Sequence, residues 1–245
     1  MTEEQIKNHK IAAEKLDAVK NAAFDFIKKN LGRVTEYDVN KFIFSEFKKE
    51  RLAADGDYPS IIVAANSNSA FVHYFPERKK SLEIGKNCLI LLDIWARLDK
   101  KDAPFADITW MGYTGKRVPP EIKKTFSRVA GARDFCVRLI KNSLKMKKLP
   151  KTNEVDGVVR KYFGKMGKYF IHGAGHSLGI EQCHGKYFRF GKKSCAKVKT
   201  GIPFTIEPGI YFKGKFGARS EINCYITKDY KLKITTKVQK EITKI

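Results

Sequence analysis

Apolar residues recur along the chain with two different periods, which predict its helices and strands. Over residues 2–32 they recur every three or four positions, so a long helix with one buried face is expected there. Thr2 and Gln5 form a capping box at its start, and Thr35 with Asp38 begins a second helix in the same way.

Compact apolar runs follow the second helix and are typical of strands. "SIIVAANS" is expected to form a strand, and "FVHYFP", which contains His73, an extended segment that ends at Pro76. "CLILLDIWARL" and "FADITWMGYTG" predict two further strands. The polar sequence "DKKDAP" between them indicates an antiparallel hairpin.

The second half of the chain repeats the order of helices followed by strands. Pro119 and Pro120 open a helix that continues to Leu144, and another helix is expected over residues 154–163. The extended segments that follow are "YFIHGAGHSLGI", "PFTIEPGIYF", "ARSEINCYIT" and "YKLKITTKV". Two such rounds, without regular alternation of strand and helix, predict an α+β fold in a single domain, residues 1–245.

Composition places the chain among globular proteins and leaves the meaning of its charge open. Hydrophobic residues make up 42% and aromatic residues 12%, which argues against disorder. The formal net charge is +23, but lysine doublets are spread along the whole chain. A lysine-rich solvated surface is therefore the simpler interpretation, and a basic surface that binds nucleic acid is the alternative.

The sequence also predicts a compartment. No apolar run is long enough to span a bilayer, and the N-terminal "MTEEQIKNHK" is too polar for a secretion signal. Five cysteines without a Cys-x-x-Cys pair fit reduced thiols better than a disulfide framework or a zinc ribbon. A soluble cytoplasmic protein without membrane association is expected.

Four carboxylates lie in unusually apolar surroundings, namely Asp93, Asp107, Glu207 and Glu221. An ionised carboxylate in an apolar strand is unfavourable unless it is paired or binds a cation. The lysines avoid these segments, so a pair of metal ions is an economical shared partner. Separate ion pairs with lysine or arginine are the alternative.

Two histidines, His172 and His176, lie four residues apart in "FIHGAGHSLGI". On a helix this spacing would place both imidazoles on one face. Gly173, Gly175 and Gly179 disfavour a helix, however, so a helical chelate is not expected.

Five motifs now occur in one order: "LLDIWA", "ADIT", "HGAGHSLG", "TIEPGIY" and "ARSEI". Together they resemble the pita-bread metallopeptidases, the family of methionine aminopeptidase, Xaa-Pro aminopeptidase, prolidase and creatinase. The resemblance covers nearly the whole chain. It implies a curved antiparallel sheet flanked by helices, in pseudo-two-fold halves, around two divalent metal ions.

The resemblance also implies a role for each matching residue. Asp93 would chelate one metal, Asp107 and Glu221 would bridge the pair, and His176 and Glu207 would complete the shell of the other. This oxygen-rich set suits manganese and tolerates cobalt, zinc or iron. Glu207 would also move a proton between water and the leaving amine.

Two details are similar to the Xaa-Pro aminopeptidase and prolidase branch, the "RSE" sequence and the His-x-Gly-x-Gly-His pattern. This similarity implies that His73, His172 and His184 face the reacting peptide and that Arg219 pairs with a ligand carboxylate. A plain surface role is the alternative for His184 and for Arg219.

The chain also departs from the family pattern. Thirteen residues separate Asp93 from Asp107, where about ten are usual, and Trp95 and Gly185 replace a glycine and a glutamate. The chain is expected to begin at the catalytic domain, whereas most members of this branch carry an N-terminal domain. Substrate choice and oligomeric state, a homodimer included, are left open by these departures.

The sequence thus predicts a two-metal aminopeptidase that releases the N-terminal residue of peptides with proline in the next position. Methionine aminopeptidase-like or dipeptidase (prolidase) activity at the same site is the enzymatic alternative. A pita-bread module that binds RNA or ribosomes is the non-enzymatic alternative, which the complete set of ligand positions disfavours. The same set argues against metal-free, creatinase-like chemistry.

Overall fold

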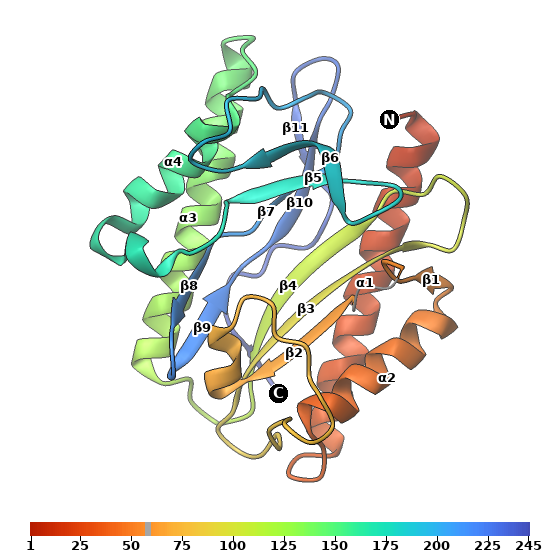
Figure 1. Ribbon diagram of the computed structural model, residues 1–245, viewed down its shortest axis with the longest axis vertical. Helices are drawn as coiled ribbons and strands as arrows, with labels where there is room; N and C mark the ends of the chain where they lie inside the picture. Colours follow the sequence, from red (N-terminus) through yellow and green to blue (C-terminus); the bar gives the residue numbers. More distant parts are fainter. Residues whose placement is uncertain (57–59) are drawn as a thin grey trace.

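The chain folds into two helix-and-sheet halves that pack side by side (Figure 1). A computed structural model describes residues 1–56 and 60–245. The helices are α1 (Glu3–Lys29), α2 (Glu36–Lys49), α3 (Pro120–Lys145) and α4 (Thr152–Phe163). Each lies where it was predicted, and both capping boxes are present. The α+β class is confirmed.

Most strands also lie where the apolar runs predict them. Their bounds are β1 (Leu52–Ala53), β2 (Ile61–Ala65), β3 (Leu89–Leu98), β4 (Ala106–Tyr113), β5 (Gly175–Leu178), β6 (His184–Phe190), β7 (Phe204–Ile206), β8 (Gly209–Phe212), β9 (Phe216–Arg219), β10 (Ile222–Ile226), β11 (Leu232–Ile234) and β12 (Thr243–Lys244). The first sheet has the order β1-β3-β4-β12, with β2 also paired to β3. The second has the order β11-β10-β7-β5-β6, and β8 pairs with β9. The predicted β3–β4 hairpin is antiparallel, as expected.

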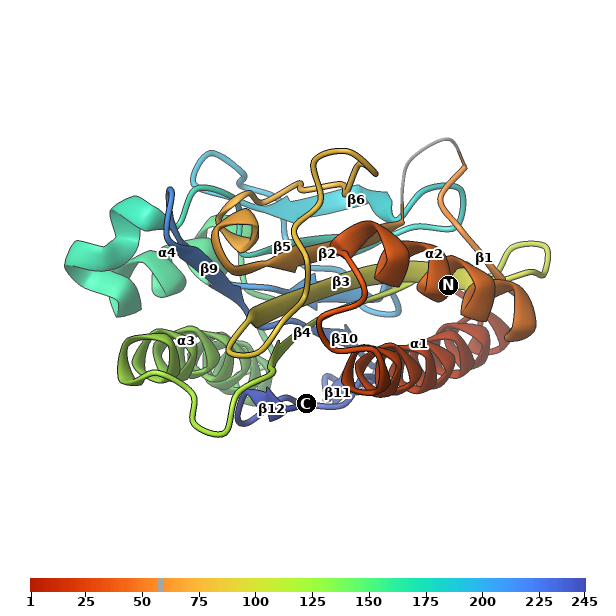
Figure 2. The ribbon, with the colours of Figure 1, turned by 90° about the horizontal axis from the view of Figure 1, so that it is seen from below.

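Strand β3 lies between two apolar cores, and its two faces contribute side chains to different cores. Ile90, Leu92 and Ile94 pack with α1 and α2, whereas Leu89 and Leu91 belong to the core under α3 and α4. Figure 2 shows α1 and α3 next to each other in one layer beneath the strands. Helices α1 and α3 therefore cover one side of the central strands, while α2 and α4 lie at the level of the strands.

The connection between β3 and β4 covers residues 99–105, and its tip lies against the start of α1. Lys100 forms an ion pair with Glu4 at 2.7 Å, and the Gln5 side chain donates to the carbonyl of Asp102. The connection thus projects beyond the paired strands, and the β3–β4 register continues without a shift.

The prediction of an extended segment over "FVHYFP" is wrong at its start. A 3₁₀ helix (Asn66–Ala70) precedes a bend at Phe71 and a turn that contains His73. The 3₁₀ helix is favoured because Asn66 adopts a positive φ of 48° and the Ser69 hydroxyl donates to the Asn66 carbonyl at 2.6 Å. Local asparagine and serine hydrogen bonds therefore outweigh the aromatic residues that suggested a strand.

Strand β6 was not among the predicted strands. Polar and aromatic residues alternate along it, and its buried residues include only Phe188 and Phe190 besides Gly185. It lies at the edge of the second sheet, where β5 is its only partner among the described strands. An edge strand with so few apolar residues gives a weak sequence signal.

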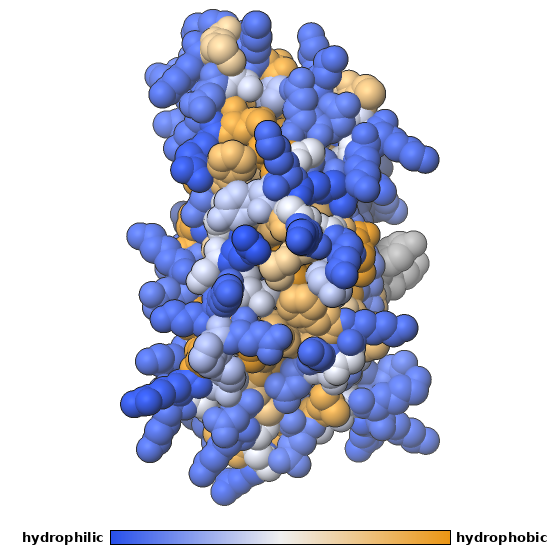
Figure 3. Space-filling view, turned by 90° about the vertical axis from the view of Figure 1, so that its left-hand side faces the viewer, coloured by the Kyte–Doolittle hydropathy of each residue, from blue (hydrophilic) through white to orange (hydrophobic). Residues whose placement is uncertain are grey.

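Most of the molecular surface seen in Figure 3 is polar, with apolar side chains in separate patches between the polar ones. None of the helices in the described ranges is long and apolar enough to cross a membrane.

His9 joins three distant segments from within α1. Its Nδ1–H donates to the carbonyl of Phe105 at 2.8 Å, and its Nε2 accepts from the Thr235 hydroxyl at 2.8 Å. The ring is fully buried, and burial lowers its pKa from 6.5 to about 4.

This burial predicts a pH-dependent stability. Between pH 6.5 and about 4 the unfolded chain binds more protons at His9 than the folded chain, so acidification through this window lowers the free energy of unfolding. The expected loss reaches about 3 kcal/mol, and denaturant unfolding of the metal-free protein across this window measures it. A His9→Gln variant should show a flatter dependence, and an unchanged slope would contradict the assignment.

Candidate metal centre

A cavity of about 610 Å³ opens beside β3, on the side away from the core of α1 and α2. It collects every residue that the sequence marked as a site residue. These are His73, Asp93, Asp107, His172, His176, His184, Glu207, Arg219 and Glu221. Residues more than a hundred positions apart in the chain thus line one cavity.

The β3–β4 hairpin places the two aspartates. Its register pairs Asp93 with Thr109 and Trp95 with Asp107, so all four side chains share one face. The aspartates are diagonal neighbours across the two strands, a separation that side chains can bridge. Trp95 lines the same cavity with its ring edge toward Phe75.

Asn223 of β10 joins this hairpin to the second sheet. Its Oδ1 accepts from the Asp107 N–H at 2.9 Å, and its Nδ2 donates to the Asp107 carbonyl at 2.7 Å. Among the described strands β4 and β10 share no backbone ladder, so this amide takes the place of one. It also fixes Glu221, two residues earlier, beside Asp107. The only sequence signal for Asn223 was a polar residue in the apolar strand "INCYI".

Substitution of Asn223 is expected to weaken both the fold and the site. Asn223→Ala leaves the buried N–H and carbonyl of Asp107 without partners, which lowers the free energy of unfolding by about 2–4 kcal/mol. Metal affinity should fall by about 10–100-fold because Asp107 is no longer held. Thermal unfolding and metal titration measure the two effects. An unchanged melting temperature would show that the amide link is dispensable.

Three carboxylates lie close enough together to share a cation. Asp93, Asp107 and Glu221 each offer an oxygen within 4.8 Å of the others. Asp107 Oδ1 and Glu221 Oε1 are buried and have no hydrogen-bond partner within residues 1–56 and 60–245. Burial, reinforced by neighbouring carboxylates, raises the pKa of both residues well above the usual range. Orphaned buried oxygens of this kind fit a bound cation.

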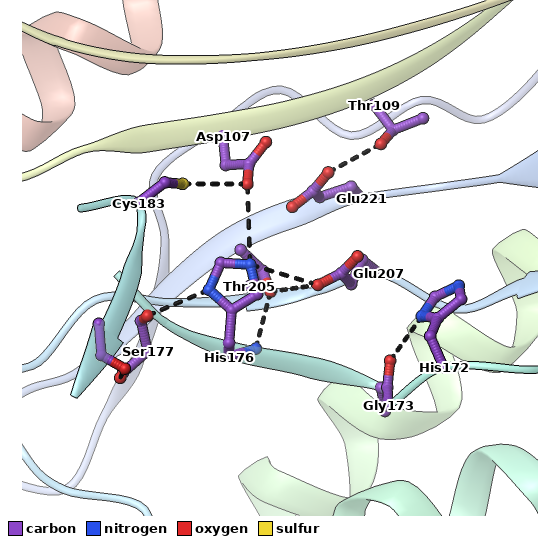
Figure 4. Close-up of polar contacts among 12 residues, drawn as sticks. Asp107, Thr109, His172, Gly173, His176, Ser177, Cys183, Thr205, Glu207 and Glu221 are labelled. Atoms are coloured by element: carbon purple, nitrogen blue, oxygen red, sulfur yellow. Dashed lines mark hydrogen bonds and ion pairs between the residues drawn. The ribbon is translucent and has the colours of Figure 1, made fainter. Parts of the chain in front are cut away.

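His176 presents a lone pair to the same carboxylates (Figure 4). Its Nδ1 lies 3.1 Å from the Ser177 carbonyl, which can only accept, so Nε2 is unprotonated in the neutral ring. Burial lowers the pKa of His176 to about 3. Nε2 lies 3.4 Å from Glu207 Oε1 and 3.8 Å from Asp107 Oδ2. Two ligand atoms that each lie about 2.1 Å from one ion are about 3.0 Å apart at a right angle and about 4.2 Å apart when they face each other across the ion. The two separations from His176 Nε2 therefore suit a shared metal ion.

Glu207 follows β7 directly, and hydrogen bonds hold both its backbone and its side-chain carboxylate. Its N–H donates to the Ala174 carbonyl at 3.0 Å, and its Oε1 accepts from the Thr205 hydroxyl at 3.1 Å. The same hydroxyl accepts from the His176 N–H at 3.0 Å. Burial raises the pKa of Glu207 to about 7, although Arg219 opposes the shift. Thr205 thus aligns two candidate ligands, a role that the sequence alone did not indicate.

Arg219 is buried, and the surface alternative for this residue is wrong. Its Nη2 pairs with Asp93 Oδ2, as expected from the sequence. Its Nε donates to the Thr109 hydroxyl at 2.9 Å, and this hydroxyl donates to Glu221 Oε2 at 2.8 Å. The guanidinium therefore offsets part of the negative charge and orients two carboxylates.

His172 lies on another side of the cavity and has different partners (Figure 4). Its Nδ1–H donates to the Gly173 carbonyl at 2.8 Å, and its Nε2 accepts from the Tyr211 hydroxyl at 2.8 Å. Arg219 Nη1 donates to the same hydroxyl at 3.1 Å. Tyr211 was not among the predicted site residues, although it belongs to the motif "TIEPGIY".

The glycines between the two histidines have a role in packing. A side chain at Gly173 would collide with the Phe190 carbonyl of β6, and one at Gly175 with the Thr205 carbonyl of β7. Gly175 also has a φ of +150°. The segment is not helical, as predicted. The backbone that comes close belongs to the flanking strands β6 and β7, and Gly173 and Gly175 themselves line the cavity.

His73 and His184 lie at the exposed part of the cavity lining. The centroid of the His184 ring is 4.2 Å from that of His176, and the two rings meet edge to face. Burial, together with the charge of Arg219, lowers the pKa of His73. Both imidazoles border the space in front of the carboxylates.

Comparison with known proteins agrees with the family resemblance of the sequence motifs. The model of metallopeptidase family M24 matches residues 7–228. An uncharacterized peptidase of Methanocaldococcus jannaschii is 30% identical over 230 residues, which are 92% of this chain and 60% of the relative.

Solved structures of similar proteins share the pita-bread fold. A prolidase from Thermococcus sibiricus is 30% identical with a TM-score of 0.81, and 100% of this chain covers 62% of it. A dipeptidase from Pyrococcus horikoshii is 27% identical with a TM-score of 0.82, and 100% of this chain covers 63% of it. The chain thus spans about 60% of the length of its relatives. On the match over residues 7–228, the chain belongs to metallopeptidase family M24.

Proposed function

We propose that this protein is a two-metal exopeptidase, with Asp93, Asp107, His176, Glu207 and Glu221 as the metal ligands. The observation that carries the proposal is the pair of buried, unpartnered oxygens of Asp107 and Glu221 beside the free Nε2 of His176. The oxygen-rich donor set suits manganese. The site draws ligands from both halves of the fold, which supports residues 1–245 as one catalytic domain.

The remaining residues have separate tasks in the proposed reaction. When bound, the two ions would lower the pKa of a water molecule and polarise the scissile carbonyl. Glu207 takes a proton at its carboxylate and returns it to the leaving amine. His172, His184 and His73 border the space that a peptide backbone would occupy, and Arg219 holds Asp93 in place.

The proposed substrates are peptides with proline in the second position. Named relatives include an Xaa-Pro dipeptidase of Lactobacillus delbrueckii, 39% identical over 79 residues, and a prolidase structure. Val72, Phe75, Trp95 and Phe190 supply apolar surface to the cavity, which suits the ring of proline.

All five cysteines are free thiols, which fits a reducing compartment such as the cytoplasm.

A panel of peptides tests this proposal. The purified protein, loaded with manganese, is expected to hydrolyse Xaa-Pro dipeptides and Xaa-Pro tripeptides faster than Met-Ala peptides. The product pattern separates dipeptidase from aminopeptidase activity. Equal or faster cleavage of Met-Ala peptides would refute the proline preference, while leaving the metallopeptidase assignment in place.

A further inference from the structure

The connection between β2 and β3, residues 66–88, carries part of the cavity lining. It contributes Val72, His73 and Phe75. After the short 3₁₀ helix at its start, this connection contains no further helix or strand. A segment of this length without strands of its own needs anchors from the rest of the fold if it is to hold side chains at a site.

Glu36, the first residue of α2, supplies several of these anchors through one buried carboxylate. Its Oε1 accepts from the Ala65 N–H at 2.6 Å, and both oxygens accept from the Asn68 side-chain amide at 3.0 Å. Its Oε2 accepts from the Tyr74 hydroxyl at 2.6 Å and from the Leu82 N–H at 2.8 Å. The carboxylate thus holds the beginning, the interior and the end of the connection.

The four donors to Glu36 are uncharged groups, namely two backbone N–H groups, an amide and a hydroxyl. A carboxylate is unfavourable in a fully buried position unless hydrogen bonds replace its hydration. Each donor would in turn lose a buried acceptor if the carboxylate were removed. The connection and α2 are therefore fixed to each other at this point.

Tyr74 links this anchor to the cavity, because it lies between two lining residues. His73 and Phe75 line the cavity, whereas the Tyr74 hydroxyl contacts Glu36. Burial, together with the hydrogen bond to Glu36, raises the pKa of Tyr74, so its hydroxyl keeps the proton that it donates. The position of His73 thus depends on a hydrogen bond made by the next residue.

We propose that Glu36 is a positioning residue for peptide hydrolysis, which holds His73 at the substrate space through the Tyr74 hydroxyl. This inference rests on the proposed function. Glu36 needs no contact with the peptide, since it acts through the segment that it anchors. A displacement of about 1 Å in a group that positions the substrate can lower a rate by about a hundredfold.

A double-mutant cycle tests this inference on the manganese-loaded protein, with the best-cleaved peptide of the panel. Tyr74→Phe removes the hydroxyl but keeps the ring, which packs against the core under α3 and α4. It should lower kcat/KM about tenfold and leave the metal content unchanged. In a His73→Ala background the same change should lower kcat/KM by less than about twofold, because the group that it positions is already absent.

Tyr37→Phe is the matched control. Tyr37 follows Glu36 on α2, and its half-buried ring lies under Lys41 Nζ at 5.6 Å. Its loss of a hydroxyl should leave kcat/KM unchanged. Glu36→Gln should lose at least as much activity as Tyr74→Phe. If thermal unfolding shows that Glu36→Gln does not fold, the Tyr74→Phe cycle decides the question.

The cycle separates positioning from a general structural role. An equal loss from Tyr74→Phe with and without His73, or no loss in either background, would overturn the inference and leave the metallopeptidase in place. A natural protein that cleaves no peptide of the panel would overturn the proposed function and this inference with it.

Discussion

An Asp107→Asn variant is expected to lose its bound divalent ions and nearly all peptidase activity while it remains folded. In the proposed centre Asp107 would supply its carboxylate oxygens as metal ligands, and a neutral amide in its place would bind cations weakly. The loss of kcat/KM should reach at least about a thousandfold, because bound ions contribute several kcal/mol to hydrolytic transition states. Elemental analysis and a peptide assay measure the two losses together.

The same variant should be more stable than the natural protein when both lack metal. Asp93, Asp107 and Glu221 lie close together in a buried space, and among the described lysines and arginines Arg219 alone forms an ion pair with one of them, Asp93. Removal of one charge relieves this repulsion, so the free energy of unfolding should rise by about 1–2 kcal/mol. An inactive yet stabilised variant cannot be explained by misfolding.

Asp102→Asn provides the matched control for this experiment. Asp102 is an exposed carboxylate at the tip of the β3–β4 hairpin, with a φ of 58° that asparagine tolerates well. It should change neither metal content nor activity. Full metal content in Asp107→Asn would contradict the proposed centre. Salt-sensitive RNA binding by a natural protein without peptidase activity would instead favour the nucleic-acid alternative.

The chain order of the candidate ligands could be predicted because each lies in a short local pattern. Asp93 and Asp107 occupy apolar strands, where an ionised side chain is conspicuous, and Glu207 and Glu221 lie in similar settings. A two-residue period also puts Asp107 and Thr109 on one face of their strand, whereas the register that sets Asp93 opposite Thr109 depends on the hairpin connection as well. Local periodicity was sufficient for these elements.

The partners that hold the ligands could not be predicted, because they depend on contacts between distant segments. Asn223 contacts Asp107 across 116 positions, and Cys183 contacts it across 76. Neither pairing leaves a period or a motif in the sequence. The turn at His73 was also missed, since besides the local hydrogen bond of the preceding 3₁₀ helix it has a distant partner, Arg219, which donates to the Val72 carbonyl. Tertiary contacts decide such features, and local propensity does not.

Alanine at His176 and alanine at His172 are expected to produce two different losses, although the residues lie four positions apart. His176→Ala removes the nitrogen atom that faces both Glu207 and Asp107, so affinity for at least one metal ion should fall by about a hundredfold or more. His172→Ala removes a ring whose hydrogen bonds are to Gly173 and Tyr211, so metal content should remain full.

The activity of His172→Ala should nevertheless fall by about 10²–10³-fold, because the cavity loses a polar group that borders the substrate space. Elemental analysis beside steady-state kinetics separates the two variants, and excess manganese should restore activity to His176→Ala only. Equal metal loss in both would contradict the division of roles. The geometry supports different roles for the two histidines. In both rings the Nδ1–H group donates to a backbone carbonyl. The Nε2 of His176, however, faces the carboxylates of Asp107 and Glu207, whereas the Nε2 of His172 accepts a hydrogen bond from the Tyr211 hydroxyl.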